Sequence, residues 1–270
     1  MIEQVRARVA DLLGQLDGVV GLQRTTAGTA PYLFRQGDDL SLLELQPRYP
    51  LSPIISLIHK QHPEVNIGVV ARACDIRALV EMAKRQQIDP ARLHILAVAC
   101  SPSEVEECYC SAPMPRLDDW PKAEMIGTPA EGSAPNPIVA EYRNTSMEER
   151  REFWQQQFLK CIKCYGCRNI CPVCFCESCA LEDPLWVEPG VLGPPFPMYH
   201  LIKAMHMSGR CVDCHQCELT CPSHIPLTIL YELIRQDVKE LLDYVPGMDL
   251  AAEPPLSLAL KDGQLIADSE

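Results

Sequence analysis

The feature that most constrains this chain is one cysteine pattern that occurs twice, Cys-x-x-Cys-x-x-Cys-x-x-x-Cys-Pro. The two copies contain eight of the 15 cysteines: Cys161, Cys164, Cys167 and Cys171, then Cys211, Cys214, Cys217 and Cys221. This is the bacterial-type spacing for a pair of [4Fe–4S] clusters. The sequence therefore predicts at least two such clusters and the transfer of single electrons.

The fourth cysteine of each copy is expected to ligate the cluster of the other copy, as in two-cluster ferredoxins. This rule gives two ligand sets: Cys161, Cys164, Cys167 and Cys221 for the first cluster, and Cys211, Cys214, Cys217 and Cys171 for the second. Pro172 and Pro222 fit this arrangement, because proline donates no N–H and stops the preceding turn from continuing as a helix.

Two other uses of these cysteines are weaker. Structural zinc sites favour two separated Cys-x-x-Cys pairs rather than three cysteines in a row and a Cys-Pro. A disulfide framework is less favoured still, since the cysteine count is odd and no secretory signal is recognisable. Fifteen cysteines are more readily kept as metal ligands in a reducing compartment.

The composition bounds the class of protein. A chain of 270 residues with 47% hydrophobic and 22% charged residues is an ordinary globular protein of one or two domains. Its formal net charge of −12 argues against nucleic acid as a partner. No segment approaches the roughly 20 apolar residues of a membrane span. We therefore expect a cytoplasmic protein or a subunit carried by others.

The first half of the chain has the pattern of an α/β domain. Residues 2–16 have a helical period, and residues 32–45 are expected to form a hairpin that turns at residues 37–39. A short helix is expected at residues 53–59. Strands at residues 66–71 and 94–99 flank a helix at 75–86, which predicts a parallel βαβ unit.

The second half is expected to be mostly helical and ferredoxin-like. Ser146 and Glu149 form a capping-box pattern for a helix that runs through Phe158 into the first cysteine motif. Residues 111–138 are interpreted as a linker or long loop, and the Pro-rich residues 184–197 separate the two motifs. An apolar helical stripe follows the second motif, as core or as a docking face for a partner: Leu227, Leu230, Tyr231, Ile234, Val238, Leu241 and Leu242.

The predicted domains are residues 1–142, a cysteine-bearing α/β domain with a parallel sheet, and residues 143–246, a dicluster [4Fe–4S] domain. Residues 247–270 are expected to be a weakly structured tail.

Four further cysteines lie in the α/β half: Cys74, Cys100, Cys108 and Cys110. The first two follow the strands at residues 66–71 and 94–99, so both thiols are expected at the carboxyl edge of the sheet, where open α/β folds place ligands. The Cys108-Tyr-Cys110 segment can reach the same edge. These four thiols are candidates for a third [4Fe–4S] cluster. The alternatives are buried thiols that pack as small apolar groups, or a redox-active or zinc site.

The remaining cysteines, Cys174, Cys176 and Cys179, follow the first motif directly. They are candidates for a further cluster or a zinc site, or for exchange with the ligands assigned above. Among the histidines, His215 lies inside the second motif and is expected to shape hydrogen bonding around that cluster. His200, His206 and His224 are expected to be surface or hydrogen-bonded histidines.

Three segments resemble known iron–sulfur subunits: GVVARACDIRALVEMAKRQQID with HILAVACSPSEVEECYC, then KCIKCYGCRNICPVCFCESC, and finally GRCVDCHQCELTCPSHIPLTILYELIR. The first two are similar to beta-type subunits of deazaflavin-reducing hydrogenases and formate dehydrogenases, and to related subunits of sulfhydrogenase and anaerobic sulfite reductase. The third is similar to dicluster modules of heterodisulfide-reductase-type proteins. Many hydrogenase beta subunits carry a flavin and place the cluster segment first. The reversed order here, without a recognisable flavin signature, argues against a flavin.

The resemblance and the motifs together imply an electron-transfer subunit of a multisubunit anaerobic oxidoreductase, with partner subunits that carry flavin or clusters. Every strong motif serves electron transfer, and no nucleophile–base pair or nucleotide-binding motif is recognisable. The alternative is a reductase in its own right, with a flavin or an open-site cluster in the α/β domain.

Overall fold

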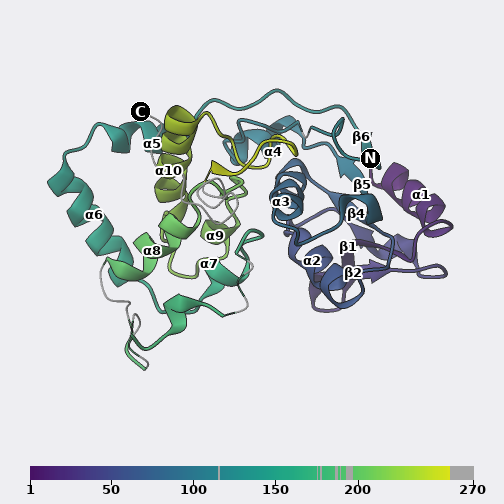
Figure 1. Ribbon diagram of the computed structural model, residues 1–270, viewed down its shortest axis with the longest axis horizontal. Helices are drawn as coiled ribbons and strands as arrows, with labels where there is room; N and C mark the ends of the chain where they lie inside the picture. Colours follow the sequence, from purple (N-terminus) through teal and green to yellow (C-terminus); the bar gives the residue numbers. More distant parts are fainter. Residues whose placement is uncertain are drawn as a thin grey trace, which may run out of the picture. The chain divides into compact units, whose positions relative to one another are not determined.

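A computed structural model describes residues 1–114, 116–174, 176, 178–185, 188, 190–192 and 197–255. The chain divides into two compact units, Met1–Ala134 with Gly247–Ala252, and Pro135–Pro246 with the segment that begins at Glu253 (Figure 1). The fold class is mixed α/β, as predicted, because the first unit is built on a sheet and the second on helices.

The sheet of the first unit is mostly parallel. It has the order β2-β1-β4-β5-β6, with β3 also paired to β1, and its strands are β1 (Gly18–Thr25), β2 (Gly28–Phe34), β3 (Leu43–Glu44), β4 (Ile67–Ala71), β5 (Leu93–Val98) and β6 (Ala123–Ile126). Only β2 and β3 run antiparallel to their neighbour β1. The predicted βαβ unit is confirmed, since β4 and β5 are parallel neighbours with Val69 opposite Ile95.

Helices cover both faces of this sheet, α1 on one side and α2 and α3 on the other (Figure 1). The four helices are α1 (Ile2–Leu13), α2 (Ser52–Gln61), α3 (Ala73–Lys84) and α4 (Pro102–Glu107), with single 3₁₀ turns at Leu40–Leu42 and Pro90–Arg92. Val5 and Val9 of α1 pack in one core cluster with Leu96 and Val98 of β5. Because side chains alternate along a strand, Val69 and Ile95 face the opposite layer.

Two sequence-based expectations for this unit are wrong. Residues 32–45 do not form a hairpin: β2 pairs with the preceding strand β1 through a turn at residues 26–27, and β3 also pairs with β1. Residues 111–138 are not only a linker, because they contain β6. The charged Glu124 interrupts the apolar pattern by which a strand is recognised in the sequence. The strand accommodates Glu124 because Arg8 and His94 each lie 2.7 Å from its carboxylate.

The chain returns to the first unit at residues 247–252, within the segment expected to be a tail. The N–H of Gly247 donates to Glu81 at 2.7 Å, and Glu81 also pairs with Lys84. A side chain at position 247 would meet the Arg77 carbonyl oxygen at 2.5 Å, and the φ of +77° also favours glycine. Residues 256–270 of the expected tail lie outside the described residues.

The second unit consists of helices joined by irregular loops. Its helices are α5 (Pro137–Arg143), α6 (Met147–Leu159), α7 (Gly166–Asn169), α8 (Met198–His206), α9 (Gln216–Leu219) and α10 (Leu227–Leu242), with a 3₁₀ turn at Ala180–Glu182. The capping box of α6 is confirmed: Ser146 accepts from the Glu149 N–H at 3.3 Å, and Glu149 accepts from the Ser146 N–H at 2.7 Å.

Helix α10 spans the predicted apolar stripe and packs on α5, α8 and α9. Leu227, Leu230 and Tyr231 are buried, so the first half of the stripe is core. Leu241 and Leu242 at its end are exposed. In the described part of the chain, no helix has both the length and the apolar character needed to cross a bilayer.

Candidate iron–sulfur sites

The two cysteine motifs fold into loops with the same backbone. Each loop has two residues with positive φ, Lys163 and Tyr165 at 52° and 56° in the first and Asp213 and His215 at 58° and 60° in the second. Such conformations cost about 1–3 kcal/mol each for residues other than glycine, and they persist only where the surroundings enforce them. Both loops lead into one-turn helices, α7 and α9, which contact each other.

The same backbone gives the first thiol of each motif a hydrogen-bond donor. The N–H of Lys163 donates to Cys161, and the N–H of Asp213 donates to Cys211. Burial raises the pKa of Cys161, and the Lys163 N–H lowers it in part. Burial raises the pKa of Cys211 to about 12, against the opposing charge of Arg235. Donors of this kind are one of the means by which proteins adjust cluster potentials.

Thiols of the first predicted ligand set surround one cavity. Cys161, Cys164, Cys167 and Cys221 all line it, and its empty volume is about 340 Å³ including its open mouth. Cys221 lies close enough to raise the pKa of both Cys161 and Cys167, although burial is the larger cause for each. The cysteine that the crossover rule takes from the distant motif is thus brought to the other three.

The second predicted set also gathers a thiol from the opposite motif. Burial raises the pKa of Cys217, and Cys171 and Cys211 are among the neighbours that raise it further. Cys171 also raises the pKa of Cys211. Cys214 lies in the same loop and is half-buried. Cys167 of the first set also raises the pKa of Cys217, so the two sets are neighbours.

Cys174, Cys176 and Cys179 gather beside the second set. Burial raises the pKa of Cys174 to about 11, and Cys171, Cys176 and Cys179 are among its charged neighbours. Cys179 accepts a hydrogen bond from Arg168, which also pairs with Glu182 at 2.5 Å. Cys176 is exposed.

The four cysteines of the first unit come together at the carboxyl edge of its sheet. Cys74 lies at the start of α3, directly after β4, and Cys100 follows β5. Burial raises the pKa of Cys74 to about 12, and Cys100 contributes to the shift. Cys100 is in turn a neighbour of Cys110. Cys108 is a neighbour of both Cys100 and Cys110.

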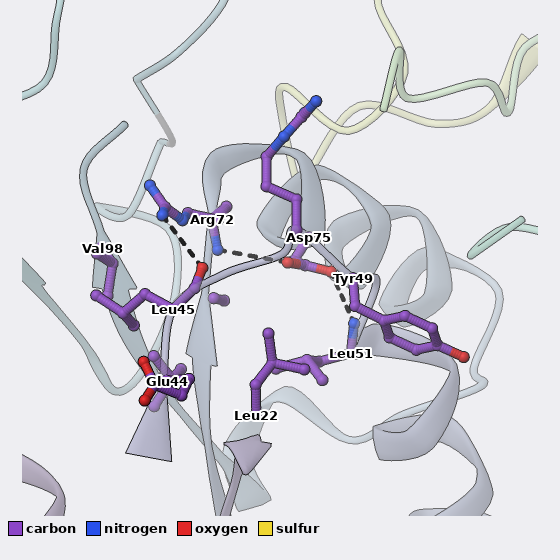
Figure 2. A pocket seen from close by; sticks show the side chains of 11 residues that line it. Leu22, Glu44, Leu45, Tyr49, Leu51, Arg72, Asp75 and Val98 are labelled. Carbon is purple, nitrogen blue, oxygen red and sulfur yellow. Dashed lines mark hydrogen bonds between the residues drawn. The ribbon is translucent and has the colours of Figure 1, made fainter. Parts of the chain in front are cut away.

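Arginines frame this edge. Arg72 donates to Cys100, to the Ala99 carbonyl at 3.3 Å and to Glu104 at 3.0 Å, so it ties the ends of β4 and β5 to α4. Figure 2 shows the adjacent pocket, where Arg72 reaches the Leu45 carbonyl and Asp75 accepts from the Leu51 N–H. Arg48 also lines this pocket, and its positive charge partly offsets the upward shift in the pKa of Cys74 and of Cys108.

The described residues contain no group of three or more His, Cys, Asp or Glu side chains placed to hold a single metal ion. The thiols of the first set instead lie around a cavity, which is the arrangement that a guest wider than one ion needs. A set of four thiols is also the donor chemistry of a [4Fe–4S] cluster. The residues of this site therefore fit the predicted cofactor.

Several polar groups near the cysteines have no signal in the sequence. Tyr199, His200 and Lys203 of α8 are each 2% exposed, and no hydrogen-bond partner lies within range of the His200 ring nitrogens. The Tyr199 hydroxyl donates to the Cys167 thiol. His200 stacks on Phe158 and lines the cavity of the first set. The expectation of a surface or hydrogen-bonded histidine is wrong for His200, whereas His206 is exposed.

His215 points to a neighbour on its own loop. Its Nε2 lies 2.9 Å from Asp213, which also pairs with Arg235 at 2.8 Å. The structure thus places the second motif's histidine in a charged network with α10.

Known proteins match part of the chain. No protein-family model matches it. It is 39% identical over 120 residues to the F420-dependent formate dehydrogenase subunit beta of Methanocaldococcus jannaschii, which is 43% of this chain and 32% of that protein. It is 42% identical over 119 residues to the F420-dependent formate dehydrogenase 1 subunit beta of Methanococcus maripaludis, or 43% of this chain and 30% of that protein.

The resemblance to formate dehydrogenase beta subunits is confirmed. It holds for the matched stretch, and the chain spans about a third of the length of the curated relatives that it matches.

Proposed function

We propose that this chain is an iron–sulfur subunit of a multisubunit cytoplasmic oxidoreductase, in which it relays single electrons between redox centres of its partners. The cavity lined by Cys161, Cys164, Cys167 and Cys221 carries the proposal, because it joins thiols from two motifs around one space. The relatives are named as subunits of F420-dependent formate dehydrogenases, which supports a place in a complex of that kind.

In this proposal the thiols of the two crossed sets hold two [4Fe–4S] clusters, which supply a one-electron change without a chemical step on substrate. Lys163 and Asp213 donate backbone N–H groups to Cys161 and Cys211 and so stabilise negative charge on these sulfurs. The neighbouring thiols Cys167 and Cys217 belong to different sets, which supports a short route between them.

A third cluster at Cys74, Cys100, Cys108 and Cys110 is part of the proposal. Three observations support it: the four thiols are neighbours, they lie at the carboxyl edge of a parallel sheet, and arginines that offset negative charge surround them. Cys174, Cys176 and Cys179 are proposed to hold a further cluster or zinc, and their proximity to each other supports this.

A second candidate function is a reductase in its own right. The pocket beside Arg72 favours it, since that pocket lies at the same sheet edge as the four thiols of the first unit (Figure 2). An enzyme of this type would turn over a defined donor when purified alone, and a bound flavin would appear in its visible spectrum. An electron carrier would reduce dyes only when partner subunits feed it.

The test is purification of the full chain with its partners under anaerobic conditions, followed by iron, sulfide and EPR analysis. We expect at least two [4Fe–4S] clusters, which means at least about eight iron atoms. Four or fewer iron atoms in a fully loaded, partner-bound sample would contradict the proposal. Substrate turnover by the isolated chain would favour the second candidate.

A further inference from the structure

Helix α8 (Met198–His206) lies between the two motifs in the sequence and turns its polar side inward. Tyr199, His200 and Lys203 are buried, while the apolar Leu201 and Met205 are 38% and 69% exposed. An ordinary helix of a globular protein has the opposite arrangement, with its apolar stripe facing the core. The rings of Tyr199 and His200 pack on other aromatic rings, which leaves Lys203 as the group on this buried face that packing does not explain.

Lys203 is the most costly of these groups to bury. Its side chain is 2% exposed, and its hydrogen-bond neighbour is the uncharged hydroxyl of Tyr231. Its ammonium lies 5.0 Å from the centre of the Tyr231 ring, and no carboxylate pairs with it among the residues that the structure describes. Burying an unpaired charge is strongly unfavourable, so a nearby negative charge is needed to offset it.

The groups around Lys203 identify that charge. Tyr199 and His200 of the same helix line the cavity of the first set, and Met207 at its end lies 3.8 Å from the Cys171 sulfur of the second set. The thiols of Cys171, Cys217 and Cys167 are among the neighbours of the Lys203 ammonium. These thiols come from both proposed ligand sets: Cys167 from the first, and Cys171 and Cys217 from the second. Lys203 is thus the neighbour of two sites that would each hold a negatively charged cluster.

We propose that Lys203 is a positioning charge shared by both [4Fe–4S] sites, which raises the reduction potential of each of them. This inference rests on the proposed function. Reduction adds one electron, and so one negative charge, to each site, and a fixed ammonium in a poorly solvated interior stabilises that added charge. With both sites stabilised by one cation, the unit can accept two electrons in succession.

The test replaces the ammonium by a side chain of similar length. In Lys203→Met, we expect the equilibrium constant for reduction of each cluster to fall about tenfold, which is 59 mV for a one-electron couple. The measurement is an EPR-monitored redox titration of the anaerobically purified full chain. Lys203→Arg should keep both potentials close to those of the wild type. Lys239→Met is the matched control, since it removes an exposed lysine of the same unit and should leave both potentials unchanged.

Iron and sulfide content separates this inference from the function on which it rests. If the wild type holds no clusters, the proposed function fails. If Lys203→Met retains its iron and its potentials are unchanged, or only one of them moves, the shared charge is refuted while the proposed function stands. If Lys203→Met and Lys203→Gln both lose iron and Lys203→Arg keeps it, the charge is required to hold the clusters, which supports the inference. Equal iron loss in all three variants would make Lys203 a packing residue and overturn it.

Discussion

The two units of this chain bury different kinds of side chain. In the first, Val9, Val69 and Ile95 are fully buried between the sheet and its helices, and a buried charge such as Glu81 is paired, with Lys84. In the second, half-buried cysteines on strained loops lie beside buried polar groups such as His200 and Lys203. An apolar core stabilises a fold by itself, whereas strained loops and unpaired polar groups need a compensating partner. The comparison indicates that the proposed clusters would stabilise the second unit far more than the first.

Removal of iron should give the largest effect and tests this contrast directly. After anaerobic chelation, we expect amides of α7 and α9 to exchange hydrogen at least about 100-fold faster, because the metal that holds their loops is lost. Amides of β4 and β5 should change much less. Hydrogen exchange with mass spectrometry on the full chain measures both. Equal acceleration in the sheet would show that the first unit is also organised by metal.

Substitution of the fourth cysteine of one motif should damage the cluster held mainly by the other motif. In Cys171→Ala we expect damage to the cluster of Cys211, Cys214 and Cys217, and in Cys221→Ala damage to the cluster of Cys161, Cys164 and Cys167. Each variant should lose up to about four iron atoms. The two variants are matched controls for each other, because they change the same position of the repeated motif.

EPR of the two variants assigns the surviving signal. The crossed assignment is wrong if Cys221→Ala perturbs only the cluster of its own motif.

In the first unit, the double variant Cys108→Ser with Cys110→Ser should lower iron by about four atoms and abolish partner-linked electron transfer. The clusters of the second unit should persist, since no cysteine of their sets is changed. Tyr109→Phe is the control, because it alters the same loop without removing a thiol. Unchanged iron in the double variant would leave Cys74, Cys100, Cys108 and Cys110 as packing residues.

The sequence predicted those parts of the molecule that depend on local patterns. The strands at β4 and β5, the capping box of α6 and the bounds of α10 follow from periodicity and from single residues at helix starts. The ligand sets assigned from motif spacing stay a prediction, which the cavity lined by the first set supports. Strand β6 was missed because Glu124 breaks its apolar pattern and is stabilised by Arg8, a residue distant in sequence.

The inward face of α8 was also beyond local patterns. Leu201 and Met205 suggest an apolar stripe, and only the tertiary structure shows that Lys203 is on the buried side instead. A polar residue becomes informative when its burial is known, and burial is set by long-range packing around the cysteines.

The smallest predicted effect concerns the serine N-caps of α4 in the first unit and α6 in the second. Ser101 and Ser146 each cap a helix that leads toward cysteines, and each accepts from the N–H three residues later at 3.3 Å. Replacing a serine cap by alanine costs about 1 kcal/mol of helix stability, and we expect this for Ser146→Ala. Ser101→Ala should cost less, because Arg72 pairs with Glu104 at 2.9 Å and holds the first turn of α4 independently. Hydrogen exchange of the first-turn amides measures both variants. Equal acceleration would show that Arg72 does not support α4, and that the two units hold their cysteine-bearing segments in the same way.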